Sequence, residues 1–220
     1  MKIVVQMSGG IESTTLIAKA IKEVGKENVF PIGFNDDTFS YKMKESYASK
    51  QVIRHYQLQQ NVYICSCPHW DDFEYPLSAD FPDFGFVPGM KLIMNMISQA
   101  YAQKIGADEV WIGNMNDNVY SDENKDNVKH SAELFNTIYG KNIKIVAPFQ
   151  NMSKSDVIVY ADSIGVPLEI TNSCGNESFF SGYNCGICDW CVKRREAFKQ
   201  AYIKSGVIDK SVYPLLREKK

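Results

Sequence analysis

Residues 3–15, IVVQMSGGIESTT, constrain the fold of this chain more than any other stretch. The apolar residues 3–5 predict a buried strand, and apolar residues at helical spacing from Ile11 onward predict a helix directly after it. Gly9 and Gly10 therefore lie in a sharp turn between strand and helix, where glycine accepts a positive φ without a Cβ penalty. The free N–H groups of a first helical turn attract anions, so this turn is a candidate anion site.

The side chains of this turn favour a phosphate as the anion. Hydroxyl donors surround the glycines, at Ser8, Ser13, Thr14 and Thr15. The turn lacks the Gly-Lys-Ser/Thr ending of a Walker loop, so the phosphate is expected to be held without that fixed lysine. The alternative is a tight turn with incidental hydroxyls. The position after the first strand and the serine-rich flank make us favour the phosphate site.

Residues 8–13, Ser-Gly-Gly-Ile-Glu-Ser, resemble the pyrophosphate loop Ser-Gly-Gly-x-Asp-Ser of the N-type ATP pyrophosphatases, with Glu12 in place of aspartate. The resemblance implies that the loop holds the phosphates of ATP while the α-phosphorus is attacked. It also implies that Glu12 helps to hold Mg²⁺. The ATP-binding residues implied by the resemblance are Ser8, Gly9, Gly10, Glu12, Ser13 and Thr14.

Length and charge exclude several classes of protein. A chain of 220 residues is one domain, or one domain with a small appendage, and it buries enough surface to fold without disulfide or metal cross-links. Its net charge of −2 argues against a large non-specific nucleic-acid surface, so we expect no direct nucleic-acid binding. No apolar run reaches the roughly 18 residues of a membrane span, and the sequence opens on a strand rather than a signal peptide. We therefore expect a cytoplasmic protein.

Strands and helices alternate along the chain. The expected strands lie near residues 3–5, 28–34, 61–67, 109–113 and 143–147, with helices between them. This alternation predicts an α/β fold with a mostly parallel, five-stranded, Rossmann-like sheet and helices on both faces. We expect the α/β domain over 1–170 and a cysteine knuckle with a C-terminal helix over 171–220.

Three segments outside the regular alternation are candidates for function. The aromatic and acidic segment 68–88 is a lid or a subunit contact, or else a surface excursion that packs its own rings. The polar loop 114–122 follows the fourth strand, at the sheet end where open α/β sheets bind ligands. Lys154 opens a helix that Ser153 caps, a position unfavourable for lysine in the helix dipole unless an anion lies nearby. The alternative is a solvated surface lysine.

The cysteines Cys174, Cys185, Cys188 and Cys191 form the pattern C-x10-C-x2-C-x2-C. Four thiolates close a tetrahedral zinc site with no open position, which makes such a site structural. An iron–sulfur cluster also takes four thiolates, and disulfides are the third alternative. We favour zinc, with its charge balanced by the basic residues 193–195.

The motifs together resemble the 7-cyano-7-deazaguanine synthase family over nearly the whole chain. They are the phosphate loop, Phe86-Val87-Pro88-Gly89, Ser153-Lys154-Ser155-Asp156, and the terminal cysteine pattern with its following R-x2-A-F. The resemblance implies that ATP adenylates the carboxylate of 7-carboxy-7-deazaguanine with loss of pyrophosphate. Ammonia then displaces AMP to give the amide, and a second ATP dehydrates the amide to the nitrile. It also implies Mg²⁺ and Zn²⁺ as metals, and we expect a homodimer.

Carried over residue by residue, the resemblance makes Lys154, Ser13 and Glu12 the catalytic residues, with Lys154 neutralising charge on the phosphates. The deazaguanine would contact Asp122, together with Tyr120 and Phe86. Several positions depart from the family's pattern. The family's Gly-Gln-Arg is here 35–38, Asn-Asp-Asp-Thr, its Arg-Asn after Val-Pro-Gly is Met-Lys at 90–91, and the loop before residue 120 is shortened.

These departures leave alternatives open. Divergent relatives in antiviral systems, including type IV CBASS, join the activated deazaguanine to a protein amine instead of ammonia. A tRNA sulfurtransferase shares the phosphate loop but wants a catalytic cysteine in the α/β domain, where only Cys65 and Cys67 are available. A non-catalytic zinc-ribbon module would leave the phosphate loop unexplained. For amidation or conjugation, we expect the amine to come from outside the chain, as free ammonia or on a partner, because no room remains for a glutaminase domain.

Overall fold

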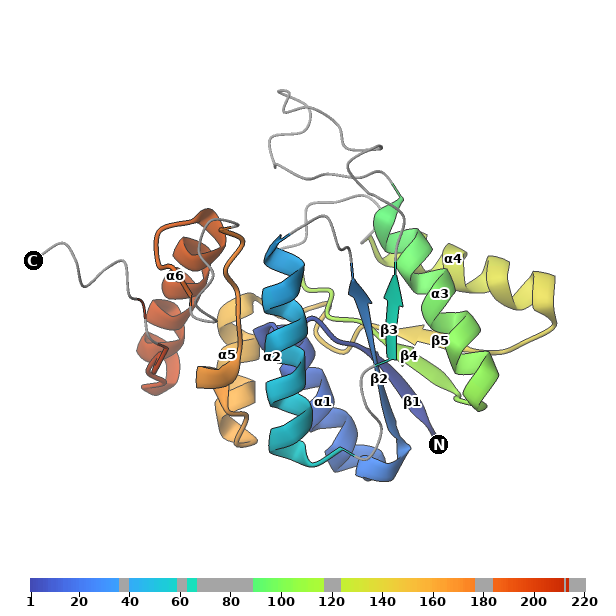
Figure 1. Ribbon diagram of the computed structural model, residues 1–220, viewed down its shortest axis with the longest axis horizontal. Coiled ribbons are helices and arrows are strands. Elements are labelled where there is room, and N and C mark those ends of the chain that lie inside the picture. The colour runs from blue at the N-terminus through green and yellow to red at the C-terminus, as the bar shows by residue number, and fades with distance from the viewer. Residues whose placement is uncertain are drawn as a thin grey trace, which may run out of the picture.

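The protein is a parallel α/β fold, as the sequence predicts (Figure 1). The computed structural model describes residues 1–35, 40–58, 63–66, 89–116, 124–176, 184–211 and 213. The strands are β1 (Ile3–Gln6), β2 (Val29–Asn35), β3 (Tyr63–Ser66), β4 (Glu109–Trp111) and β5 (Lys144–Val146). The helices are α1 (Ile11–Val24), α2 (Ser40–Tyr56), α3 (Met90–Ile105), α4 (Lys125–Tyr139), α5 (Lys154–Ser163) and α6 (Asp189–Ser205), with short 3₁₀ turns η1 (Lys26–Asn28) and η4 (Leu168–Ile170).

The five strands are all parallel and lie in the order β3-β2-β1-β4-β5. Ile3 in the central strand pairs with Val29 on one side and with Glu109 on the other. The chain thus builds outward from β1 to β3 and then returns to the other side of β1 with β4. Ligands of open α/β sheets bind at such a reversal, outside the carboxyl ends of the strands. The reversal here lies between β1 and β4.

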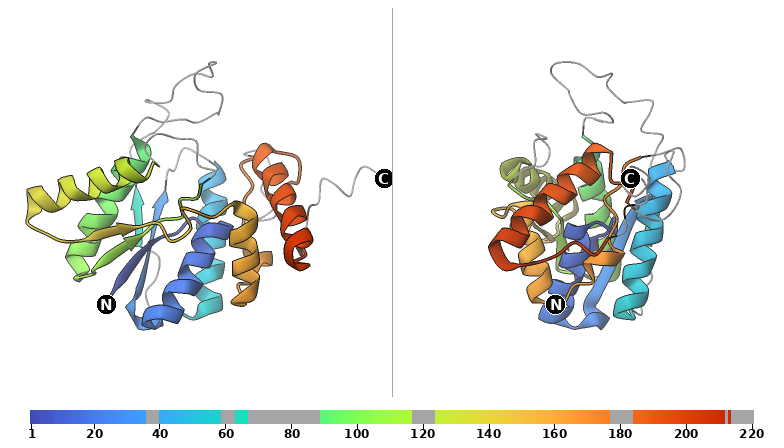
Figure 2. Two further views of the ribbon diagram at one scale, coloured as in Figure 1. Left: turned by 180° about the vertical axis from the view of Figure 1, so that it is seen from behind. Right: turned by 90° about the vertical axis from the view of Figure 1, so that its left-hand side faces the viewer.

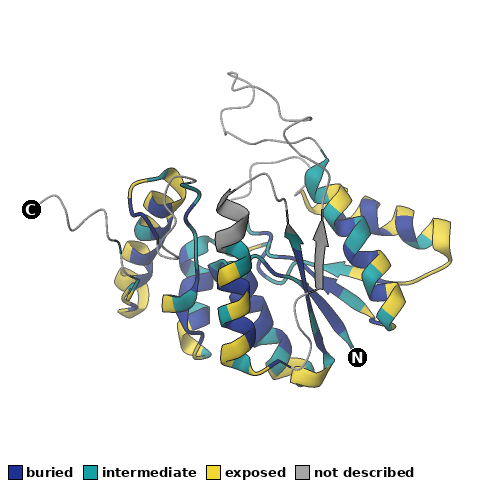
Figure 3. Ribbon diagram, in the orientation of Figure 1, coloured by how far each residue is buried: buried dark blue, intermediate teal, exposed yellow. Residues whose placement is uncertain are grey.

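Helices cover both faces of the sheet (Figures 1 and 2). Successive side chains of β1 point to opposite faces and are therefore buried under different helices. Ile3 and Val5 are fully buried in a core shared with α1, α2, α5 and α6. Val4 is fully buried in a second core, shared with α3 and α4. Figure 3 shows the buried residues facing the sheet from both helical layers.

The C-terminal helix α6 lies beside α5 and packs into the first core (Figure 1). Ala197, Phe198 and Ala201 of α6 are buried in the same cluster as residues of α1 and α5. A boundary between 170 and 171 stays a prediction. Among the described residues, no helix is long and apolar enough to cross a membrane.

Several expectations fall outside the described residues. These are the segment 36–38, the aromatic segment 68–88 with Phe86, and the loop 117–123 with Tyr120 and Asp122. The expected roles of these residues remain predictions.

Candidate active site and metal centre

The turn between β1 and α1 is a closed ring of hydroxyl and backbone groups. Ser13 Oγ lies 3.3 Å from the backbone nitrogen of Ser8, 3.3 Å from Ser8 Oγ and 3.3 Å from the carbonyl oxygen of Gly10. The N–H of Gly10 donates to Ser8 Oγ at 3.3 Å. These bonds hold the two serines against the backbone at the start of α1, so the hydroxyls of Ser8 and Ser13, two of the four predicted to bind phosphate, lie together.

A side chain at either glycine of the turn would make close contacts with neighbouring atoms. Gly9 has a φ of +81°, and a Cβ there would lie 2.5 Å from Ala48 Cβ and 2.7 Å from the backbone nitrogen of Ser49 in α2. Gly9 therefore needs both its left-handed backbone and its lack of a side chain. At Gly10 a Cβ would lie 3.3 Å from Ser8 Oγ and 3.5 Å from Glu12 Oε2. It would fill the space between those two side chains.

Thr14 has an unsatisfied hydroxyl beside the turn. Its N–H donates to the carbonyl oxygen of Gly10 at 3.0 Å, but its buried Oγ1 has no hydrogen-bond partner among the described residues. A buried hydroxyl without a partner costs about 1 to 3 kcal/mol. Such a donor, together with the space at Gly10, fits a turn that holds an anion.

Glu12 and Lys154 form an ion pair at this end of the sheet. Lys154 Nζ, in the first turn of α5, lies 2.7 Å from Glu12 Oε1, in the first turn of α1, and their side chains are 23% and 17% exposed. Burial alone would raise the pKa of Glu12, but Lys154 outweighs it, and the pKa lies below its ordinary value. Glu12 is therefore an ionised carboxylate at neutral pH, as a Mg²⁺ ligand must be.

Gly113 brings the end of β4 close to the start of α1. A Cβ on Gly113 would lie 3.2 Å from Glu12 Cβ and 3.9 Å from the backbone nitrogen of Ser13. The ion pair thus sits at the reversal between β1 and β4. A buried polar cluster lies on the α3 side of the same strand end, where Gln6 Nε2 donates to Asn95 Oδ1 at 3.0 Å and to Ser98 Oγ at 3.1 Å.

The motif Ser153-Lys154-Ser155-Asp156 divides into structural and chemical parts. Ser153 caps α5, as predicted, and forms a reciprocal capping box with Asp156. Lys204 of α6 donates to Asp156 Oδ1 at 2.6 Å and to Ser155 Oγ at 2.7 Å, which ties α5 to α6. Of this motif's recorded contacts, the ion pair of Lys154 with Glu12 is the one that reaches residues 8–13, the predicted phosphate-binding turn (the phosphate turn).

The four cysteines converge as the sequence predicts. Their sulfur atoms all lie within 4.8 Å of one another, and Cys174, Cys185 and Cys191 are buried. A tetrahedral zinc site with bonds of about 2.3 Å places its sulfurs about 3.8 Å apart. The Sγ atoms of Cys185 and Cys191 are 3.9 Å apart. The donor set therefore fits zinc.

Backbone donors surround these sulfurs. The N–H of Cys185 donates to Cys174 Sγ at 3.4 Å, and the N–H of Cys188 donates to Cys185 Sγ at 3.4 Å. Hydrogen bonds of this kind stabilise thiolate, the form that binds metal.

Arg194 follows the cysteines but is engaged elsewhere. Its side chain is fully buried, and its guanidinium donates to Thr171 Oγ1 at 2.8 Å, to the carbonyl oxygen of Leu168 at 3.0 Å and to Ser211 Oγ at 2.8 Å. It also pairs with Asp209 at 3.4 Å. Arg194 thus joins α6 to segment 168–173 and to residues 209–211, and its recorded hydrogen bonds are with these segments and not with a cysteine sulfur.

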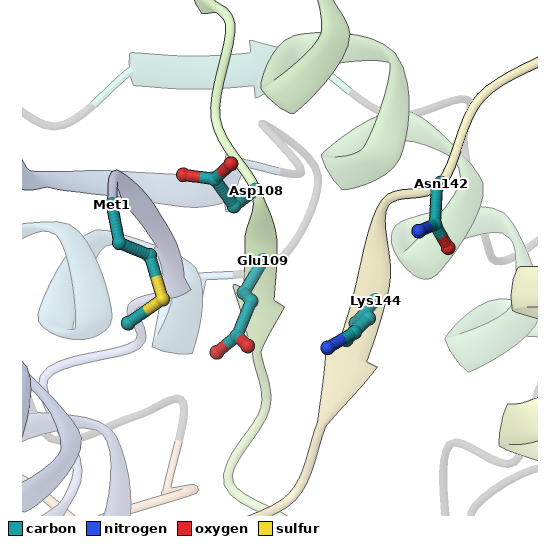
Figure 4. Close-up of a pocket in the computed structure, with 5 residues that line it drawn as sticks. All are labelled: Met1, Asp108, Glu109, Asn142 and Lys144. Carbon is teal, nitrogen blue, oxygen red and sulfur yellow. The ribbon is translucent and has the colours of Figure 1, made fainter.

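A separate cavity of about 430 Å³ lies at the opposite end of the sheet (Figure 4). It is lined by Met1, Asp108, Glu109, Asn142 and Lys144. These residues lie at the amino ends of β1, β4 and β5, whereas parallel sheets bind ligands at the carboxyl ends. We therefore place the candidate active site at the phosphate turn and assign no role to this cavity.

Three contributors to the site were not predicted from the sequence. The sequence placed Gly113 only at the end of the predicted strand 109–113, and it gave no indication for Asn172. Asn172 donates its N–H to the carbonyl oxygen of Gly9 at 2.9 Å. The cluster of Gln6 with Asn95 and Ser98 carries no motif. All three depend on contacts between distant segments, which spacing alone does not encode.

Comparison with known proteins identifies the family. The model of "Queuosine biosynthesis protein QueC" matches residues 2–202. The chain belongs to the QueC family. This QueC-family chain is 29% identical over 229 residues to a 7-cyano-7-deazaguanine synthase from Acetivibrio thermocellus, covering 96% of this chain and 97% of the relative.

A second curated relative has the same name. The 7-cyano-7-deazaguanine synthase from Thermoplasma acidophilum is 32% identical over 220 residues, covering 91% of this chain and 88% of the relative. Among solved structures, an NMN synthetase from Francisella tularensis aligns with a TM-score of 0.47 and 15% identity, over 96% of this chain and 89% of that chain. The QueC assignment rests on the sequence matches.

Proposed function

We propose that this QueC-family enzyme uses ATP to activate the carboxylate of 7-carboxy-7-deazaguanine. A carboxylate oxygen attacks the α-phosphorus, pyrophosphate leaves, and an acyl adenylate forms. Ammonia then attacks the acyl carbon and AMP leaves, which gives 7-amido-7-deazaguanine. A second adenylation, at the amide oxygen, followed by loss of AMP and a proton, gives 7-cyano-7-deazaguanine. Family membership and the names of the relatives support this reaction class.

The ion pair between Glu12 and Lys154 beside the phosphate turn is the observation that carries the proposal. A carboxylate is a poor electrophile, so catalysis depends on positioning and on stabilising charge at the phosphates. The turn offers Ser8, Ser13 and the first N–H groups of α1 as donors. Lys154 is a cation in contact with Glu12 of the same turn, and we propose that it neutralises charge on pyrophosphate as it leaves.

Glu12 would hold Mg²⁺ in this proposal, because it is an ionised carboxylate at the turn. Mg²⁺ supplies charge neutralisation of the ATP phosphates when it is bound. Lys154 and Mg²⁺ would then share one carboxylate. We infer that Lys154 turns from Glu12 toward the phosphates when the metal binds.

We propose that Asp122 accepts hydrogen bonds from the amino and imino edge of the deazaguanine, with Tyr120 and Phe86 as an aromatic wall. The departures at 35–38 and 90–91 favour one alternative, in which a protein amine replaces ammonia. The family match gives no support to the sulfur-transfer alternative. We further propose a cytoplasmic homodimer that does not bind nucleic acid directly.

The test incubates purified protein with ATP, Mg²⁺ and 7-carboxy-7-deazaguanine, with and without ¹⁵N-labelled ammonium. We expect AMP and pyrophosphate only when the acid is present, and label in the product amide or nitrile. Formation of ADP and phosphate would contradict the adenylation. Formation of AMP without labelled product, together with attachment to a co-encoded protein, would support the conjugating alternative.

A further inference from the structure

Asn172 lies between the phosphate turn and the cysteine cluster and contacts both. Its backbone N–H donates to the carbonyl oxygen of Gly9 at 2.9 Å. Its side-chain Oδ1 accepts from the backbone N–H of Cys174 at 2.7 Å. A Cβ on Gly10 would lie 3.7 Å from the carbonyl oxygen of Asn172, so the residue also packs directly on the turn. Asn172 therefore contacts both Cys174, the first of the four cysteines, and the two glycines of the turn.

The contact at Gly9 controls the direction of a loop donor. The carbonyl of Gly9 and the N–H of Gly10 belong to one peptide unit, which is planar and trans. A hydrogen bond that fixes the carbonyl oxygen of Gly9 therefore also fixes the direction of the Gly10 N–H. That N–H is the donor that now bonds Ser8 Oγ. The orientation of the phosphate turn thus depends on where Asn172 lies.

The position of Asn172 depends in turn on the cysteine knuckle. Asn184, next to Cys185, accepts from the N–H of Ser173 at 2.8 Å and donates to the carbonyl oxygen of Thr171 at 3.4 Å. Arg194, three residues after Cys191, donates to Thr171 Oγ1. Asn184 is 4% exposed and Arg194 is fully buried. Thr171 and Ser173, the two neighbours of Asn172 in the chain, are therefore both held by hydrogen bonds to residues of the knuckle.

We propose that Asn172 is a positioning residue that couples the four-cysteine metal centre to the phosphate turn. Metal binding fixes Cys174, Cys174 fixes the side chain of Asn172, and the backbone of Asn172 fixes the Gly9–Gly10 peptide. The metal then acts on ATP binding without touching ATP. The functional consequence rests on the proposed ATP site, whereas the structural coupling does not.

The test is Asn172→Ala in the metal-loaded protein, which removes the side-chain bond to Cys174 and keeps the backbone bond to Gly9. Asn136→Ala is the matched control, because Asn136 also bonds backbone groups through both side-chain atoms, donating to the carbonyl of Ile143 at 2.9 Å and accepting from its N–H at 3.0 Å. Asn136 lies in α4, on the other face of the sheet from α1 and α5.

We expect amide hydrogen exchange of residues 8–14 to become about three- to tenfold faster in Asn172→Ala, the scale of one lost hydrogen bond. The Kd and KM for ATP should rise by a similar factor with kcat little changed and zinc content unchanged. Asn136→Ala should change none of these. Equal loop exchange in the two variants would overturn the proposal.

Metal removal supplies a second arm. Chelation should speed exchange at residues 8–14 in the wild type and add less to the rate in Asn172→Ala, because the two changes break one path. Additive effects would overturn the coupling. If the wild type fails to bind ATP, the proposed function is wrong, while the exchange comparison still decides the role of Asn172.

Discussion

The phosphate turn and the cysteine knuckle position their chemical groups in different ways. The turn follows the central strand β1 and leads into the buried helix α1, and its shape comes from glycines, backbone groups and short hydroxyl side chains. The described residues of the knuckle before α6, 171–176 and 184–188, form no helix or strand, and four thiol side chains make up its centre. The sheet therefore positions the turn, whereas we propose that a bound metal holds the ligands of the knuckle together.

The two regions are therefore expected to be vulnerable to different substitutions. A steric change at a loop glycine should damage ATP binding more than stability, because the surrounding sheet remains packed. A change at a cysteine should damage stability first, because metal-binding free energy is also folding free energy.

Loss of one metal ligand should have the largest effect on stability. Cys185→Ala removes a fully buried sulfur that accepts N–H groups from its own loop. We expect loss of the bound zinc and of about 4 kcal/mol or more, which corresponds to about 10 °C or more in melting temperature. Elemental analysis and calorimetry check this. Iron with sulfide in the wild-type protein, or a cysteine variant of unchanged stability, would contradict the structural zinc.

Gly9→Ala should abolish ATP binding at a smaller cost in stability. The new Cβ would meet Ala48 and Ser49 at less than 3 Å, on a backbone with φ of +81°. Overpacking and the left-handed conformation together cost about 2 to 4 kcal/mol. Gly165→Ala is the control, because Gly165 has a φ of +74° with nothing within 4 Å of its Cβ position. We expect calorimetric titration to detect ATP binding in the control but not in Gly9→Ala.

Lys154→Ala should lower turnover by about tenfold or more, the scale of one lost charge-assisted contact. Ser13→Ala should act on the same scale, because its hydroxyl bridges both ends of the turn. Lys204→Ala is the matched control, since Lys204 also contacts α5 through an ion pair but bonds Asp156 instead of Glu12. Equal loss of AMP formation in the two lysine variants would show that Lys154 only holds the helix.

The smallest expected effect concerns pH and the contact between α5 and α6. A hydrogen bond from Lys204, with help from Ser153, lowers the pKa of Asp156 from 3.8 to about 2. Since the folded pKa is the lower one, the stabilisation is complete above about pH 4 and is lost as the pH falls toward 2.

Asp156 is 45% exposed, so solvent screens the pair and its removal should cost at most about 1 kcal/mol. Asp156→Asn should therefore destabilise the protein modestly at pH 7 and less at pH 3, as measured by urea unfolding. Asp162→Asn, on the exposed side of the same helix, should show no such difference. A loss of stability in Asp156→Asn that is the same at pH 7 and at pH 3 would contradict the lowered pKa of Asp156.

The sequence predicts those parts of the site that depend on local spacing. Short sequence patterns predict the turn at residues 8–13, the helix cap at Ser153 and the cysteine cluster. In the structure Ser8 and Ser13 contact each other, Ser153 caps α5, and the four cysteine sulfurs lie close together. The parallel five-stranded sheet follows from the alternation of strands and helices. These features need only local chemistry and periodicity.

Contacts across the fold were not predictable. The bond from Asn172 to Gly9 joins segments more than 160 residues apart, and the close approach of Gly113 to Glu12 depends on β4 pairing with β1. The basic residue Arg194 was expected to balance the thiolates, but its full burial beside Asp209 and Thr171 depends on the path of the chain after α6. Tertiary packing decides these contacts.

Transfer of oxygen from the substrate to AMP tests the adenylation most directly. The 7-carboxy-7-deazaguanine would be prepared with ¹⁸O in its carboxylate and incubated with ATP, Mg²⁺ and ammonium. If that carboxylate attacks the α-phosphorus and is released from carbon when the amine enters, mass spectrometry will find one ¹⁸O atom in AMP. Unlabelled AMP, or ADP as the nucleotide product, would contradict the account.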